Sequence, residues 1–202
     1  MQLNTILTCL FAALVLYYIH QVREDKTMSR SKNSYEIRAL SFLKQFAKYV
    51  DNWESVKRVN YAVNMFNMKR HRKVEFLSGA TRLCVVTSDY VIKWDRRGDS
   101  KYNDCEIFGG CRDEVAFYYN TVVPSGFGYM FCRPTWCFYN GIEFEIMPRV
   151  KIPTNDEIEL GWEDILSEAE QDFVNSNLID VETHNWGWFR GQLVFYDYAA
   201  MA

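Results

Sequence analysis

Proline and histidine are scarce in this sequence, with four prolines and three histidines among 202 residues. So few prolines exclude a long extended linker, and the sequence has neither an internal repeat nor a low-complexity segment. Six cysteines are too few for a small disulfide-stabilised protein. Hydrophobic residues make up 49% and aromatic residues 16%, which excludes disorder throughout the chain. The length fits one domain of ordinary size, or a small domain with an anchor.

The small net charge of -3 hides two regions of opposite sign. Residues 21–73 hold thirteen Lys or Arg against five Asp or Glu, whereas residues 74–202 hold ten against twenty-one. A nucleic-acid-binding protein would carry its positive charge on the folded domain. The sequence therefore predicts no nucleic-acid partner.

The N-terminal region lacks charged side chains from Leu3 to Ile19. This length matches the hydrocarbon core of a bilayer, so residues 1–20 are predicted to form a transmembrane anchor. A cleaved signal peptide is the less favoured alternative, because no basic residue precedes the apolar run and no small-x-small cleavage site follows it. Four basic residues after the run place the folded domain on the cytoplasmic side of a single-pass membrane protein.

The basic region, residues 21–73, contains two stretches with apolar residues every three to four positions, 37–50 and 53–66. Both are predicted to be amphipathic helices, with Asp51 or Asn52 capping the second. Their basic faces either point into water or lie against an anionic membrane surface, and both can hold together.

Two cysteine pairs, Cys105/Cys111 and Cys132/Cys137, are separated by six and five positions. Zinc sites use closer spacing, and no histidine lies near either pair. Buried or half-buried thiols, reduced in the cytoplasm, are therefore favoured over a metal site.

The body, residues 74–202, alternates between apolar and polar side chains as strands do. The predicted elements are three strands at 74–77, 82–87 and 90–94, a helix at 113–119, a strand at 144–148, an acidic helix around 162–175, and a hairpin at 188–189 and 192–196.

Lys93 stands out because it lies inside an apolar strand, although alone it would be read as an edge-strand lysine in water. Lys93 follows Val91 and Ile92, and four more polar residues come after it in a recognisable order. They are Glu114 on the predicted helix, Asp180 and Asn185 at a spacing of five, and Asp197 after an apolar strand. Over residues 74–199 the chain resembles the protein-kinase-like superfamily, in particular its small aminoglycoside-phosphotransferase-like and viral members.

The resemblance implies an α+β fold in which an antiparallel N-lobe sheet with a helix is followed by a truncated C-lobe. It also implies binding of ATP and Mg²⁺, because phosphoryl transfer depends on positioning and charge neutralisation. Asp180 and Lys93 would be catalytic, and Asn185 and Asp197 would bind the metal. Nucleotide-binding residues would be Ser78, Gly79, Ala80, Thr81, Lys93, Glu114, Glu145 and Met147, the last two lying at the hinge between lobes.

The sequence departs from the family pattern at three places. The loop 78–81 has one glycine instead of three, His184 directly precedes Asn185, and the chain ends five residues after Asp197. Three hypotheses follow: a membrane-anchored minimal kinase, a pseudokinase that binds a host protein partner, and a membrane structural protein. By analogy, the small size and short anchor resemble a bacteriophage product.

Overall fold

The computed structural model describes residues 34–71, 73–79, 82–96, 110–178 and 185–197. The chain divides into two units, residues 1–37 and 38–202, and every element below lies in the second except the start of the first helix. Among the described residues, no helix is long and apolar enough to span a bilayer. The predicted anchor at residues 1–20 lies outside the described residues.

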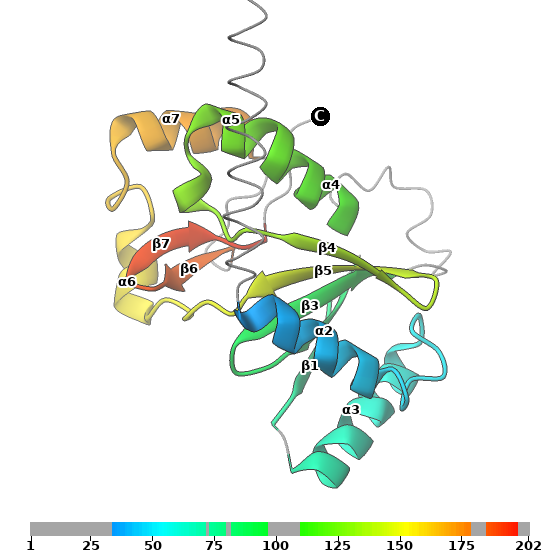
Figure 1. Ribbon diagram of the computed structural model, residues 1–202. Helices are drawn as coiled ribbons and strands as arrows, with labels where there is room; N and C mark the ends of the chain where they lie inside the picture. The colour runs from blue at the N-terminus through cyan, green and yellow to red at the C-terminus, as the bar shows by residue number, and fades with distance from the viewer. Residues whose placement is uncertain (1–33, 72, 80–81, 97–109, 179–184, 198–202) are drawn as a thin grey trace, which may run out of the picture. The chain divides into compact units, whose positions relative to one another are not determined.

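A five-stranded antiparallel sheet in the order β1-β2-β3-β5-β4 forms the centre of the second unit (Figure 1). Its strands are β1 (Glu75–Ser78), β2 (Arg82–Val86), β3 (Tyr90–Asp95), β4 (Thr135–Tyr139) and β5 (Ile142–Pro148). A second, two-stranded sheet consists of β6 (Trp186–Phe189) and β7 (Gln192–Phe195). The α+β class is confirmed, as are the predicted strands to within a few residues, whereas β4 was not predicted.

Two helices cover one face of the sheet, α2 (Ser34–Phe46) and α3 (Val56–Arg70), as the ribbon shows (Figure 1). Both lie where the apolar periodicity predicts them. The predicted cap of α3 is wrong, because Ser55 is the N-cap and its hydroxyl accepts the Arg58 N–H. Asn52 instead accepts the N–H groups of Glu54 and Ser55 and shapes the turn before the cap.

The core under these helices is largely aromatic. Trp94 on β3 is 1% exposed, packs edge-on against Trp53 and Phe144, and donates its indole N–H to the Trp53 carbonyl at 2.9 Å. Phe46 and Phe66 join the two helices by edge contacts. This face therefore supplies much of the apolar burial that stabilises the fold.

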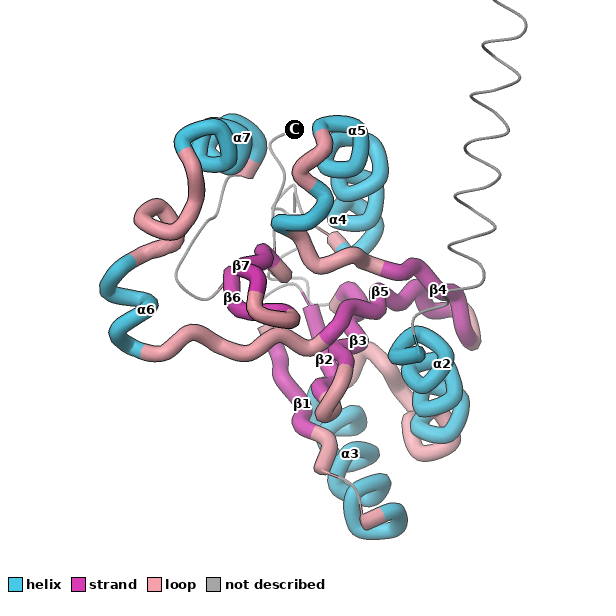
Figure 2. The backbone as a smooth tube through the Cα atoms, turned by 60° about the vertical axis from the view of Figure 1, so that its left-hand side comes forward, coloured by secondary structure: helices cyan, strands magenta, loops and turns pink. Residues whose placement is uncertain are grey.

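The opposite face of the sheet lies beneath α4 (Cys111–Phe117), which continues as a π-helical turn, Tyr118–Val122, and α5 (Val123–Ser125) (Figure 2). The 3₁₀ turn Gly128–Met130 and the helices α6 (Asn155–Leu160) and α7 (Glu168–Asn177) complete this side. The predicted acidic helix corresponds to α7, which begins later than expected because Ser167 caps it through Glu170.

A second apolar core joins α4, α7 and the β6-β7 hairpin. Its largest buried members include Trp162, Trp186 and Phe195. Backbone hydrogen bonds fix the hairpin on both sides, from the Cys132 N–H to the Phe195 carbonyl at 2.8 Å and between Lys151 and Trp188 in both directions. The hairpin thus holds the segment that follows β7 next to the larger sheet.

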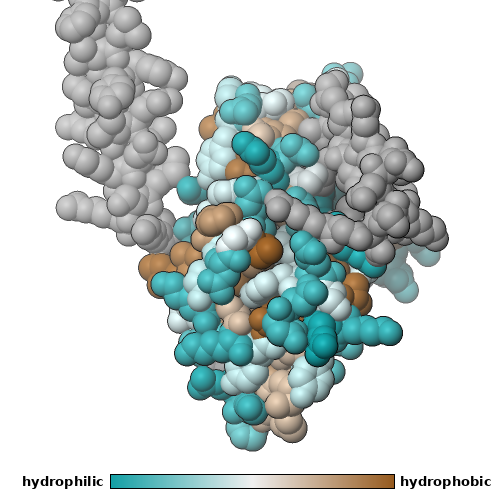
Figure 3. Space-filling view, turned by 90° about the vertical axis from the view of Figure 1, so that its right-hand side faces the viewer, coloured by the Kyte–Doolittle hydropathy of each residue, from teal (hydrophilic) through white to brown (hydrophobic). Residues whose placement is uncertain are grey.

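On the face shown in Figure 3, hydrophilic side chains predominate and hydrophobic ones are scattered among them. Described apolar residues that are exposed, such as Tyr61 and Phe138, are ordinary when they occur singly. The polar side chains beneath α4 are therefore the more informative feature.

Candidate functional site

Charged side chains occupy the sheet face beneath α4, which is unusual for a buried surface. Lys93 on β3 is opposite Cys84 on β2 and Glu145 on β5, so the three side chains form a row across the sheet. Because strand side chains alternate between faces, Arg82 lies on the same face as Cys84. Lys93 is 5% exposed and Glu145 is 0% exposed, so the row is enclosed by protein.

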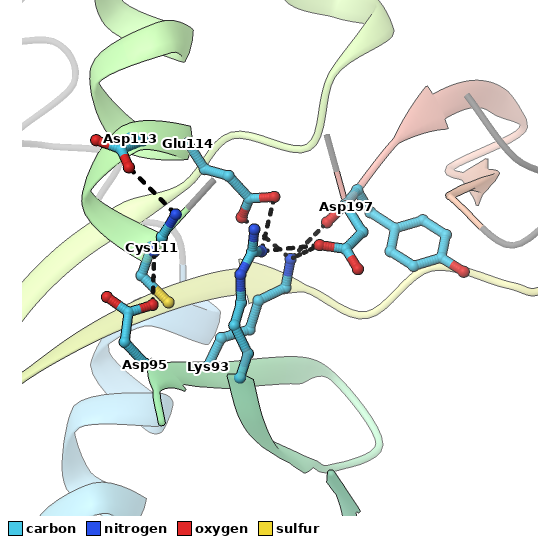
Figure 4. A network of polar contacts seen from close by, with 9 residues as sticks. Lys93, Asp95, Cys111, Asp113, Glu114 and Asp197 are labelled. Atoms are coloured by element: carbon cyan, nitrogen blue, oxygen red, sulfur yellow. Dashed lines mark hydrogen bonds and ion pairs between the residues drawn. The ribbon is translucent and has the colours of Figure 1, made fainter. Parts of the chain in front are cut away.

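Lys93 forms ion pairs with two carboxylates that come from distant parts of the chain (Figure 4). Its Nζ is 3.2 Å from Glu114 Oε2 and 3.3 Å from Asp197 Oδ1. It also donates to the Tyr196 carbonyl at 2.8 Å. The ion pair between Lys93 and Glu114 that the kinase-like resemblance implies is therefore present, and Asp197 joins it.

Arg82 forms a second bridge between the same two carboxylates. Its Nη1 is 2.8 Å from both Glu114 Oε1 and Asp197 Oδ1. Arg82 was not predicted as a site residue, because its position next to Lys93 depends on the register between β2 and β3. The sequence does place Arg82 two residues before Cys84, and therefore on the face of Lys93 once the two strands are paired.

The start of α4 fixes Glu114 in this cluster. The Asp95 carboxylate, at the end of β3, accepts the Cys111 N–H at 2.9 Å (Figure 4). Asp113 in turn accepts the Gly110 N–H at 3.2 Å. These bonds satisfy two backbone donors at the helix start, so the helix that carries Glu114 is tied directly to the strand that carries Lys93.

The ion pairs outweigh the effect of burial on the cluster's protonation. Burial lowers the pKa of Lys93, but Glu114 and Asp197 raise it more, so the net pKa lies well above its usual value. Burial raises the pKa of Asp197, yet Lys93 and Arg82 lower it to about 2. Both cations and the Asp197 carboxylate therefore carry their charges at neutral pH.

Glu145 behaves differently from the other acids of the cluster. Burial raises its pKa well above the usual value, and the neighbouring Glu114 raises it further. Neither carboxyl oxygen meets a donor N–H or O–H among the described residues. Its raised pKa favours the protonated form, and a proton on Glu145 would let it hydrogen-bond to the Glu114 carboxylate.

A cavity of about 260 Å³ opens beside the cluster. Its polar lining includes Lys93, Asp197 and Tyr196, and its apolar lining comes from Leu77, Val86, Val91, Met147, Val150 and Ile152. A mainly apolar wall with a few charged groups is typical of small-molecule sites.

The sequence-predicted nucleotide-binding residues are only partly together. Met147 lines the cavity, whereas Glu145, one pleat away on β5, lies under the ion cluster and outside the lining. Ser78 ends β1, and the Gly79 N–H donates to the Arg82 carbonyl in the turn at 2.9 Å. Neither is in the cavity lining, and Ala80 and Thr81 lie outside the described residues.

Asn185 is buried next to the start of β6, with 4% exposure. Its carbonyl accepts the Tyr196 N–H at 3.0 Å, which links it to the residue before Asp197. Gly187 allows close packing here, because an added Cβ would lie 2.7 Å from the Lys151 carbonyl oxygen. Asp180 and His184 lie outside the described residues.

Asn185 and Asp197 have the oxygen donors that Mg²⁺ prefers, but the charge around Asp197 does not fit a divalent ion. Its Oδ1 already contacts two cations, Arg82 and Lys93. A third cation at that oxygen would be repelled by both unless one moved away. Among the described residues, no group of three His, Cys, Asp or Glu side chains is arranged to hold a metal.

The described cysteines are free thiols. Cys111 and Cys132 are buried, and Cys84 and Cys137 are half-buried, as the sequence predicts for these four. Burial raises the pKa of Cys84 to about 11, so this thiol beside Lys93 stays protonated at neutral pH. Cys9 and Cys105 lie outside the described residues.

Comparison of the chain with protein families, with curated proteins and with solved structures finds no match in any of the three.

Proposed function

We propose that residues 74–199 form a kinase-like domain that binds ATP in the cavity beside Lys93 and transfers its γ-phosphoryl group to a hydroxyl. The observation that carries this proposal is that Lys93 pairs with both Glu114 and Asp197, and that Lys93 and Asp197 line a mainly apolar cavity. The three residues are far apart in the chain, since 104 positions separate Lys93 from Asp197.

The topology supports the same proposal. The resemblance implies an antiparallel sheet with a strand lysine, followed by a helix whose glutamate pairs with it. Here Lys93 lies on β3, α4 follows directly among the described elements, and Glu114 on α4 contacts Lys93. The short segment after β5 leads from Met147 in the cavity wall to the helices beyond, as a hinge would.

Each group then has a chemical role. The apolar wall holds the base, and Lys93 neutralises phosphate oxygens while Glu114 keeps its ammonium group extended. In the transfer step, the acceptor hydroxyl oxygen bonds to the γ-phosphorus as the bond from phosphorus to the β–γ bridging oxygen breaks. ADP leaves, and Asp180 takes the hydroxyl proton.

Binding is tested with the full chain in detergent micelles by titration with ATP. Lys93→Met should weaken ATP binding by about tenfold or more, because it removes a charge-assisted contact to phosphate. Lys57→Met on α3 is the matched control, since Lys57 is exposed and remote from the cavity lining. Equal ATP affinity in wild type and Lys93→Met would contradict the assignment.

Transfer is tested separately with γ-labelled ATP. Asp180→Asn should abolish labelling of an acceptor while ATP affinity stays within about threefold of wild type, because a general base acts on the acceptor hydroxyl and not on the bound nucleotide. Labelling that survives this change would remove Asp180 from the mechanism.

A second function, binding without transfer, is favoured by the two cations that hold Asp197. In this case the domain is a pseudokinase that presents a nucleotide-stabilised surface to a protein partner. ATP binding together with no labelling in wild type would select it. For either function, anchoring by residues 1–20 at an anionic membrane surface stays a prediction of the sequence, tested by flotation of the chain with anionic vesicles.

A further inference from the structure

Arg82 is the residue of the cluster to which neither the sequence pattern nor the proposed function assigns a role. Its guanidinium is nearer to both carboxylates than the Lys93 ammonium is, at 2.8 Å against 3.2 and 3.3 Å. The Arg82 side chain is 11% exposed and that of Glu114 is 0% exposed, so water screens this contact little, whereas Asp197 is 46% exposed.

The charges of the cluster balance without a metal ion. Two cations, Arg82 and Lys93, contact two carboxylates, Glu114 and Asp197. With no phosphate bound, a divalent ion at Asp197 Oδ1 would add two positive charges next to Arg82 and Lys93, which would repel it.

Arginine suits a fixed cation better than lysine does. Its guanidinium keeps its charge at every physiological pH, and its planar fork can contact two carboxylates at once. Arg82 is also the first residue of β2, and its Cα is paired with that of Asp95 on β3. Its backbone is therefore held by the sheet, and the charge does not depend on the supply of an ion.

We propose that Arg82 replaces a divalent ion at Asp197, so that the cavity binds metal-free nucleoside triphosphate and gains little affinity from Mg²⁺. The proposal rests on the proposed function, because it concerns the same cavity. To reach Asp197 Oδ1, Mg²⁺ must displace Arg82 or Lys93, and this exchange offsets the affinity that the metal would add to the bound phosphates.

The test is titration of the full chain with ATP, in excess EDTA and in excess MgCl₂, for four proteins. These are wild type, Arg82→Gln, Arg82→Lys, and Arg58→Gln as a control on exposed α3. Wild type and Arg58→Gln should bind ATP within about threefold in the two buffers. Arg82→Gln should lose about tenfold or more in EDTA and recover in MgCl₂, because the metal can then take the vacant place. Arg82→Lys should stay nearer to wild type, since it keeps the charge.

Two results would overturn the inference while leaving the proposed function intact. One is wild-type binding that is about tenfold or more weaker in EDTA than in MgCl₂. The other is an Arg82→Gln variant with the same metal dependence as wild type. If Arg82→Gln fails to fold, the ratio of the wild-type ATP affinities in EDTA and in MgCl₂ still tests the inference. No ATP binding by wild type in either buffer would refute the nucleotide site itself, and this inference with it.

Discussion

The two faces of the five-stranded sheet come from the same strands and have opposite chemistry. On β3, Trp94 and Ile92 point into the aromatic core under α2 and α3, each 1% exposed. Lys93, between them, points to the opposite face and into an ion cluster beneath α4. Adjacent residues of one strand are thus all buried, but Ile92 and Trp94 pack in an apolar core whereas Lys93 forms ion pairs.

This difference shows how the protein can hold a charged cluster inside. Burying charges is costly even when they are paired, so the cluster contributes little net stability. Apolar burial supplies the net stability instead, on the aromatic face and in the second core around Trp186 and Phe195. We therefore expect substitutions on the aromatic face to change stability, and substitutions on the charged face to change ligand binding and pH dependence.

The largest effect expected on this comparison is that of Trp94→Ala. Removing the indole leaves a cavity against Trp53 and Phe144 and an unused Trp53 carbonyl, which should cost about 3–5 kcal/mol of unfolding free energy. Denaturant unfolding measures the loss. Tyr61→Ala, at an exposed aromatic on α3, is the control and should stay within about 0.5 kcal/mol. A loss below about 1 kcal/mol for Trp94→Ala would contradict the expectation that the aromatic face determines stability.

A smaller, pH-dependent effect is expected for Glu145→Gln on the charged face. Because the pKa of Glu145 is raised, the folded protein keeps a proton on this side chain that the unfolded chain loses above about pH 4.5. Wild-type stability should therefore fall as pH rises from about 4.5 toward the folded pKa, by at most about 1.4 kcal/mol per pH unit from this group. The Gln variant cannot titrate, so its stability curve should lie increasingly above the wild-type curve over that range.

The measurement is thermal unfolding at a series of pH values. Glu143→Gln, two residues earlier on β5 and on the same face, is the matched control for removing a carboxylate from this strand. A Glu145→Gln curve that runs parallel to wild type would mean that Glu145 is ionised in the folded protein.

The smallest effect is expected for Ser55→Ala, at the N-cap of the helix that covers the aromatic face. Loss of the bond to the Arg58 N–H should cost about 0.5–1 kcal/mol. Ser41→Ala, at an exposed position within α2, should cost less or be stabilising because alanine favours helices. ATP affinity should be unchanged in both variants, and a change in Ser55→Ala would show that the two faces are coupled.

Local pattern was sufficient to predict much of the sheet, because strand alternation and turn residues are properties of short segments. The Lys93–Glu114 pair was expected only from the resemblance to kinase-like proteins. The role of Arg82 and the raised pKa of Glu145 were not predictable from local pattern. Both depend on which strands are neighbours, and β5 pairs with β3 only because the chain leaves the sheet through α4 and returns.

The missed strand β4 and the misplaced cap of α3 have local causes. β4 carries Trp136, Cys137 and Phe138 in a continuous apolar run without alternation, which fits a strand or a buried helix equally well. At the cap, Asp51, Asn52 and Ser55 are all suitable residues, and only the path of the chain selects Ser55.

The wide separation of the cluster's residues also has a consequence for biosynthesis. Arg82 and Asp197 are 115 positions apart, so at 5–20 residues per second a ribosome would make them roughly 6–23 seconds apart. From the synthesis of Glu114 until that of Asp197, the nascent chain carries both cations but only one of their two anionic partners. The growing polypeptide therefore bears an extra positive charge at this place until Asp197 has been translated.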